Sequence, residues 1–177
     1  MGSVGAKGLR KAQAENIQFY SEAPENVVNA THEARDWLTK EFGDDATKIL
    51  PTAIEKGETY ARDTTIAESR KNRILIYDEK SVDTPNMVHE YTHNLTNSIF
   101  SSPDTRKANA EFDKARREVY KNAGMRANKA NDAKYVSKYG STNSHEFFSE
   151  VVRQYYDGKR NVVINTGMEY LKGKLKK

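Results

Sequence analysis

The chain has 177 residues, of which 36% are hydrophobic and 31% are charged. This length suits one domain with a core of its own, and ten Tyr, six Phe and one Trp exclude the composition of a disordered chain. The absence of cysteine excludes disulfides, thiolate metal ligands and a thiol nucleophile. We therefore expect a single domain over residues 1–177, α+β in class and mostly helical, with a flexible lead over residues 1–8.

The formal net charge is +4, and the basic residues are spread along the chain. This pattern favours a solvated cationic surface over a nucleic-acid groove, because no aromatic residues interleave with the basic ones. The sequence contains no run of about 18 apolar residues, so we expect no transmembrane helix. The N-terminus lacks the apolar core of a signal peptide. We expect a soluble monomer made in the cytoplasm, with no membrane partner.

The first part of the chain is expected to be helical. Residues 9–22 could form a first helix. Apolar residues at helical spacing predict a stronger helix from Pro24 to Phe42, which Gly43 would end. A short helix over residues 46–56 would be interrupted at Pro51.

The middle of the chain contains one convincing strand, which leads into a helix. A polar turn over residues 78–84 follows this strand. Thr84 is a candidate N-cap, and Pro85 suits the first position of a helix that runs to Ile99. The residues of the strand are Ile74, Leu75, Ile76 and Tyr77.

The last part of the chain is expected to hold three more helices. The first begins at residues 102–104 and runs to about Asn122, and residues 123–143 are partly loop. Asn143 or Ser144 starts the second helix, which ends at residues 157–158. A last short helix covers residues 166–175.

The segment from His89 to His93 reads His-Glu-Tyr-Thr-His and falls on a predicted helix. Positions four apart share one face of a helix, so His89 and His93 can direct two imidazoles at one metal ion. Zinc held by three protein ligands polarises a carbonyl and acidifies water, and Glu90 is placed to act as general base. The motif predicts one zinc ion and the hydrolysis of peptide bonds. The alternative is an incidental pair of His on a helix.

The third zinc ligand is expected on a later helix, because the seven residues after His93 contain no His. Glu146 and Glu150 are four apart, so one can bind zinc while the other holds an imidazole in orientation. His145 is adjacent to Glu146 but about 100° around the helix, which favours the pocket rim or the surface. His32 is expected to be a packed or surface residue.

These two segments carry a family resemblance. His-Glu-x-x-His together with the downstream Tyr-Gly-x-Thr-Asn-x-x-Glu-Phe-Phe-x-Glu resembles the catalytic domain of anthrax lethal factor and is similar to the Pro-Pro endopeptidases. The resemblance covers about residues 74–100 and 135–157. It implies a zincin-like fold with a small sheet, whose edge strand precedes the zinc helix.

The resemblance also implies roles for individual residues. In this fold class an edge strand binds an extended substrate by strand addition, and the strand at residues 74–77 is the candidate. The expected zinc ligands are His89, His93 and Glu146. The other implied roles are general base for Glu90, support of the oxyanion for Tyr139, and orientation of a ligand for Glu150.

The sequence departs from the family pattern within the zinc helix. Thr92 stands where the family often has Gly, and Asn94 and Asn97 stand where small apolar residues are commoner. These changes bear on the shape of the pocket. Tyr77 and Tyr91 could shape subsites for a protein or peptide substrate.

Other readings of the same chain remain open. The first is a zinc-binding scaffold without turnover, although an intact Glu90 and Tyr139 argue against it. The second is a setting in a phage head protein or a polymorphic toxin, where the domain would act in a virion or against a competitor. The third is a nucleic-acid-binding module, which only the basic charge favours.

Overall fold

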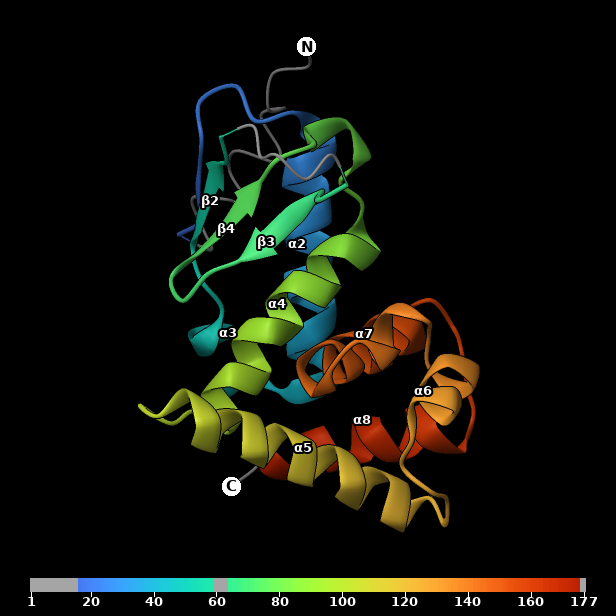
Figure 1. Ribbon diagram of the computed structural model, residues 1–177. Helices are drawn as coiled ribbons and strands as arrows, with labels where there is room; N and C mark the ends of the chain where they lie inside the picture. Colours follow the sequence, from blue (N-terminus) through green and yellow to red (C-terminus); the bar gives the residue numbers. More distant parts are fainter. Residues whose placement is uncertain (1–15, 59–63, 176–177) are drawn as a thin grey trace. The chain divides into compact units, whose positions relative to one another are not determined.

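The structure is a computed structural model that describes residues 16–58 and 64–175 (Figure 1). The fold is α+β and mostly helical, as predicted. The chain forms two compact units, Met1–Asn94 and Leu95–Lys177, and the expectation of a single domain stays a prediction. The expected flexible lead lies outside the described residues. Among the described helices, none is both long and apolar enough to cross a membrane.

The first unit contains a four-stranded sheet in the order β1-β2-β4-β3 (Figure 1). β2 pairs in parallel with both β1 and β4, and β3 pairs antiparallel with β4. The two edges of the sheet are therefore β1 and β3. The strands are β1 (Gln18–Phe19), β2 (Ala53–Lys56), β3 (Ala67–Ser69) and β4 (Arg73–Ile76).

The predicted strand exists as β4, but its predicted place at the sheet edge is wrong. β4 lies between β2 and β3, so its backbone groups are used on both sides. Ile74 and Ile76 point into the core with at most 1% exposure, and Tyr77 lies just beyond the strand. An extended substrate therefore has no access to the backbone of β4.

Two helix predictions in the first unit are wrong because long-range strand pairing prevails over local pattern. The range 9–22 contains β1 where it is described, and residues 9–15 lie outside the described part. The range 46–56 divides into helix α3 (Asp44–Ile49) and strand β2. Pro51 lies in the break between them, where Leu50 is already extended.

Helices α2 (Glu25–Phe42) and α4 (Thr84–Ile99) are the long helices of this part of the chain, with a short 3-10 turn, η1 (Glu79–Ser81), before α4. The cap of α4 is Asp83, whose carboxylate accepts the Asn86 N–H at 2.9 Å, and not Thr84 as predicted. Thr84 Oγ1 instead donates to Glu33 on α2 at 2.6 Å. This bond fixes the start of the helix that carries the predicted zinc motif.

Within the described residues, the second unit contains the end of α4, four further helices and one 3-10 turn. The first of these helices begins at Thr105, just after the predicted start at residues 102–104, and the third begins at Ser144, one of its two predicted starts. Asp104 and Asn143 cap these helices, because their side chains accept backbone N–H groups. The last helix begins earlier than residue 166. The elements are α5 (Thr105–Asn122), α6 (Lys129–Tyr135), η2 (Tyr139–Ser141), α7 (Ser144–Tyr156) and α8 (Val162–Leu175).

An aromatic cluster forms the core of the second unit. Phe112 on α5 and Phe147 and Phe148 on α7 are at most 1% exposed. The Phe147 and Phe148 rings meet edge to face at 5.2 Å, and the Tyr120 ring lies 5.7 Å from Phe147. These contacts pack α7, which carries Glu146 and Glu150, into the core of the second unit.

Candidate metal centre

His89 and His93 lie one turn apart on α4, as the motif predicts. Their Nε2 atoms are 3.2 Å apart, and their ring planes are inclined by 78°. Two nitrogens at about 2.0–2.1 Å from a tetrahedral zinc are about 3.3–3.4 Å apart, so this separation suits one shared ion. His89 is only 4% exposed, which holds its ring in place.

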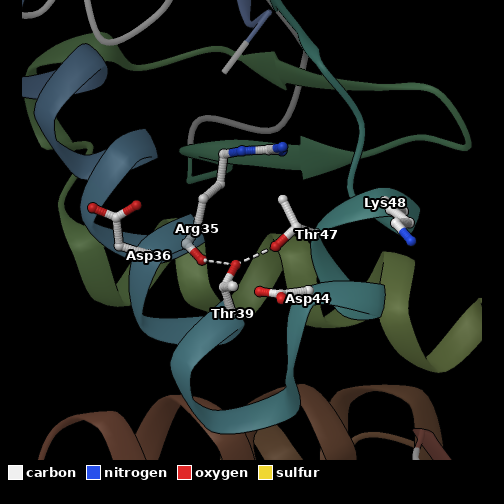
Figure 2. A pocket seen from close by; sticks show the side chains of 6 residues that line it. All are labelled: Arg35, Asp36, Thr39, Asp44, Thr47 and Lys48. Atoms are coloured by element: carbon white, nitrogen blue, oxygen red, sulfur yellow. Dashed lines mark hydrogen bonds between the residues drawn. The ribbon is translucent and has the colours of Figure 1, made fainter. Parts of the chain in front are cut away.

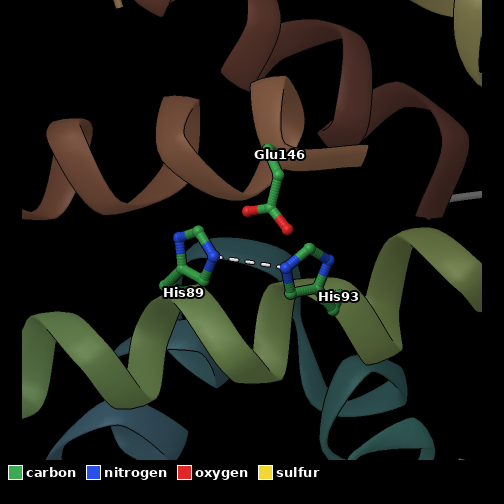
Figure 3. Close-up of side chains that lie close together, drawn as sticks. All are labelled: His89, His93 and Glu146. Carbon is green, nitrogen blue, oxygen red and sulfur yellow. Dashed lines mark hydrogen bonds between the residues drawn. The ribbon is translucent and has the colours of Figure 1, made fainter. Parts of the chain in front are cut away.

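Glu146 completes a group of three side chains that could hold a metal ion with His89 and His93 (Figure 3). Each offers one ligand atom, and these atoms lie within 4.8 Å of one another. Glu146 stands in the first turn of α7, where its N–H is bound by the Asn143 side chain at 2.9 Å. Two imidazoles and one carboxylate are a donor set that suits zinc with an open position.

Glu90, the predicted general base, is bound to the edge strand β3. Its Oε2 accepts the backbone N–H of Ser69 at 2.8 Å. This contact fixes one oxygen of the carboxylate of Glu90, the residue that follows the first His of the motif. The sequence did not predict it, because β3 is a three-residue strand with a Glu and a Ser.

Asn94 joins the same edge strand to α4 one turn further along. Its Oδ1 accepts the Ser69 hydroxyl at 2.8 Å, and its Nδ2 donates to the Arg70 carbonyl at 2.7 Å. Glu90 and Asn94 are four apart and therefore share a face of the helix. We name the group of Ser69, Arg70, Glu90 and Asn94 the strand clamp.

The register of β3 leaves backbone groups on its outer side. Arg70 N donates to Arg73 O at 2.9 Å and closes the ladder with β4. Bonded and non-bonded pairs alternate in an antiparallel ladder, so residue 68 also directs its groups at β4. Ala67 and Ser69 consequently direct their N–H and C=O groups away from the sheet. Among the described residues β3, and not β4, is therefore the strand at this edge of the sheet, and Ala67 itself is only 8% exposed.

Tyr139, the predicted oxyanion residue, lies in η2 with 54% of its surface exposed. A chain of hydrogen bonds holds its turn: the Gly140 N–H donates to Ser137 Oγ at 2.9 Å, and Ser137 Oγ donates to Glu150 at 2.8 Å. A side chain at Gly140 would press against Ser137, Val136 and Glu150 at 3.2–3.3 Å. The turn is thus seated tightly on α7.

Glu150 was expected to orient an imidazole, and that role stays a prediction. The carboxylate is 3% exposed and lies 3.8 Å from Arg153 Nη1 in addition to its bond with Ser137. A buried carboxylate of this kind is a fixed element of the fold. No pattern in the sequence pointed to Ser137, which lies in the segment expected to be partly loop.

The two remaining His residues have other surroundings. His145 Nε2 lies 2.8 Å from Asn109 Oδ1, and its ring stacks on Phe112 at 3.7 Å. His32 is 3% exposed and meets the Phe19 ring edge to face at 5.9 Å. His32 is therefore a packed residue, which is one of the two environments, packed or surface, expected for it.

Tyr77, a predicted subsite residue, contacts the edge strand by its side chain. Its hydroxyl donates to Glu68 Oε2 at 2.8 Å, and Arg70 Nη2 lies 3.1 Å from the same carboxylate group. Burial and then the bond to Glu68 raise the pKa of the Tyr77 phenol. The ring covers Gly57, where an added side chain would meet it directly.

A hollow of about 460 Å³ lies in the first unit beside α2 and α3 (Figure 2). Figure 2 shows the hydroxyls of Thr39 and Thr47, two of its lining residues, bonded to each other. The hollow offers carboxylates, hydroxyls and cations but no imidazole, so it lacks the donor set of the metal group. Its lining residues are Arg35, Asp36, Thr39, Asp44, Thr47 and Lys48.

Comparisons with known proteins give no relative for this chain. No family model, no curated protein and no solved structure matches it. Any functional conclusion must therefore come from the residues and contacts of the chain itself.

Proposed function

We infer that this protein is a zinc-dependent endopeptidase of the zincin type. The observation that carries the proposal is the group of His89, His93 and Glu146, with a potential base, Glu90, next to the first ligand. The likeness of both sequence segments to the lethal factor-like peptidases supports it. A purely structural site would need neither the carboxylate of Glu90 nor the hydroxyl of Tyr139.

The chain's own residues account for the proton transfers of peptide hydrolysis. A bound zinc ion would supply a Lewis acid that polarises the scissile carbonyl and acidifies water. Glu90 would take a proton from the attacking water as the carbon–oxygen bond forms, and would pass it to the leaving nitrogen as the carbon–nitrogen bond breaks. The Tyr139 hydroxyl would donate to the developing oxyanion.

The substrate in this proposal is an extended peptide that pairs with the outer side of β3. The N–H and C=O of Ala67 and the C=O of Ser69 face away from the sheet and suit strand addition. Ala67→Pro removes an outward N–H without deleting a bond of the ladder to β4. The KM for peptides should rise in this variant while the zinc content stays at that of the wild type.

The proposal is tested first by the zinc content of dialysed protein, measured by elemental analysis. We expect one zinc ion per wild-type chain and a loss of most of it in Glu146→Ala. His145→Ala is the matched control, because the neighbouring ring is bound to Asn109 and should leave zinc content unchanged. No zinc in the wild type after zinc is added back would overturn the proposal.

Catalysis is tested separately with a library of unstructured peptides. Wild-type protein should cleave members of the library, and Glu90→Gln should retain zinc yet lose cleavage. A wild type that binds zinc but cleaves nothing would favour the scaffold without turnover. Cleavage by Glu90→Gln at the wild-type rate would refute the role of Glu90.

A further inference from the structure

We propose that Asn94 is a positioning residue that locks the substrate-accepting edge of β3 to the helix carrying the general base. This role rests on the proposed function and deepens it, because the contacts of Asn94 would hold the edge strand in position for the substrate. It concerns the side-chain amide of Asn94 and its two partners on the strand. The metal ligands take no part in these contacts.

The amide of Asn94 uses both of its polar ends on one short stretch of strand. It accepts from the Ser69 hydroxyl and donates to the Arg70 carbonyl, at 2.8 and 2.7 Å. Asn94 is only 7% exposed, so both bonds are sheltered from water. A buried amide with both ends satisfied fixes the position and the orientation of its partners.

The third contact of the clamp links this lock to the chemistry. The Ser69 N–H donates to Glu90 Oε2, one turn before Asn94 on the same face of α4. Ser69 is thus held by its backbone to Glu90 and by its side chain to Asn94. A shift of β3 along α4 would break both contacts. The contacts therefore keep the outer edge of β3 in a fixed position relative to the Glu90 carboxylate.

The strand needs such a lock because it is short and has one neighbour. β3 has three residues, and among the described strands its one partner is β4. A short strand at a sheet edge frays easily, because few ladder bonds hold it. The clamp supplies side-chain bonds where the ladder is weak, next to the outward groups of Ala67.

The test compares Asn94→Leu with Asn97→Leu, the same substitution at an exposed position on the same helix. Backbone hydrogen exchange of residues 66–70 is followed by mass spectrometry on the full chain. Loss of two hydrogen bonds of ordinary net strength should speed exchange in Asn94→Leu by roughly thirtyfold. Asn97→Leu should exchange at the wild-type rate.

Ser69→Ala is the second variant, because it removes one bond of the clamp and keeps the N–H that binds Glu90. It should speed exchange of the same segment by roughly fivefold, the value for one bond. Wild-type exchange in both Asn94→Leu and Ser69→Ala would overturn the inference, whatever their activity. Hydrogen exchange does not depend on peptide cleavage, so it tests the inference even if the protein cleaves no peptide.

Kinetics then separate positioning from mere stabilisation. With zinc content unchanged, kcat/KM for peptides should fall about tenfold in Asn94→Leu, mainly through KM, since the paired edge moves relative to Glu90. If the wild type cleaves peptides and Asn94→Leu has the same kcat/KM per folded molecule, the positioning role is refuted.

Discussion

The turn that carries Tyr139 should depend on one serine hydroxyl. Ser137→Ala removes two bonds together, the donation to Glu150 at 2.8 Å and the acceptance from the Gly140 N–H at 2.9 Å. The substitution takes away a single oxygen and leaves the backbone intact. Its effect therefore measures the hydrogen-bond chain between η2 and α7.

The magnitude follows from the burial of Glu150. A bond to a charged group contributes about 1.5–3 kcal/mol, and a neutral bond contributes about 1 kcal/mol. The carboxylate is 3% exposed, so water cannot replace the lost donor, although Arg153 at 3.8 Å still offsets part of the charge. We expect the free energy of unfolding to fall by about 2–3 kcal/mol.

Urea unfolding followed by circular dichroism measures this loss. Ser141→Ala is the matched control in the same turn, because its hydroxyl makes an exposed bond to the Lys138 carbonyl and should contribute less than about 1 kcal/mol. Peptide cleavage should also fall in Ser137→Ala at unchanged zinc content, since Tyr139 loses its support. Equal stability of Ser137→Ala and Ser141→Ala would refute the reasoning.

Three further predictions concern the second unit. Asp132→Ala should lower the free energy of unfolding by about 3 kcal/mol, because it leaves Arg116, bound at 2.7 and 3.1 Å, without its buried partner. Gly167→Ala should destabilise by about 1–2 kcal/mol because its Cβ would lie 2.8 Å from Val151 Cγ1, and adding Val151→Ala should recover part of the loss in the same urea assay. Burial and then the bond to Asp132 raise the pKa of the Tyr120 phenol above its ordinary value of 10. Its contribution to the free energy of unfolding is therefore present below pH 10 and is lost as the pH rises through the pKa of the folded state. In Tyr120→Phe the fall in stability above pH 10 should be shallower.

Local signals in the sequence predicted the long helices well, but not the short helices α3 and α6. Apolar spacing predicted α2, and the side chains of Asp104 and Asn143 mark the starts of α5 and α7. These features depend on residues only a few positions apart, so they can be recognised in the sequence without the structure. The spacing of His89 and His93 is local in the same sense, and the structure places the pair as predicted.

Long-range pairing accounts for what the sequence did not predict. β1 and β3 have two and three residues, and neither shows the alternation of a half-buried strand. Their existence depends on β2 and β4, which lie far away along the chain. The sheet order followed from no local signal, so β4 was placed at the edge although it is central.

Asn94 shows how a buried amide on a helix can indicate a contact. A buried amide is costly unless both of its ends are paired, and an apolar residue would suffice if this position only packed against the core. Both ends are paired here, one with Ser69 at the end of β3 and one with Arg70, the next residue. The polar residues of α4 therefore have two sets of contacts: His89 and His93 form, with Glu146, the group that could hold a metal ion, and Glu90 and Asn94 bind the edge strand. Because one helix carries both sets, in the proposed peptidase a change that moves β3 should alter substrate binding before it alters zinc binding.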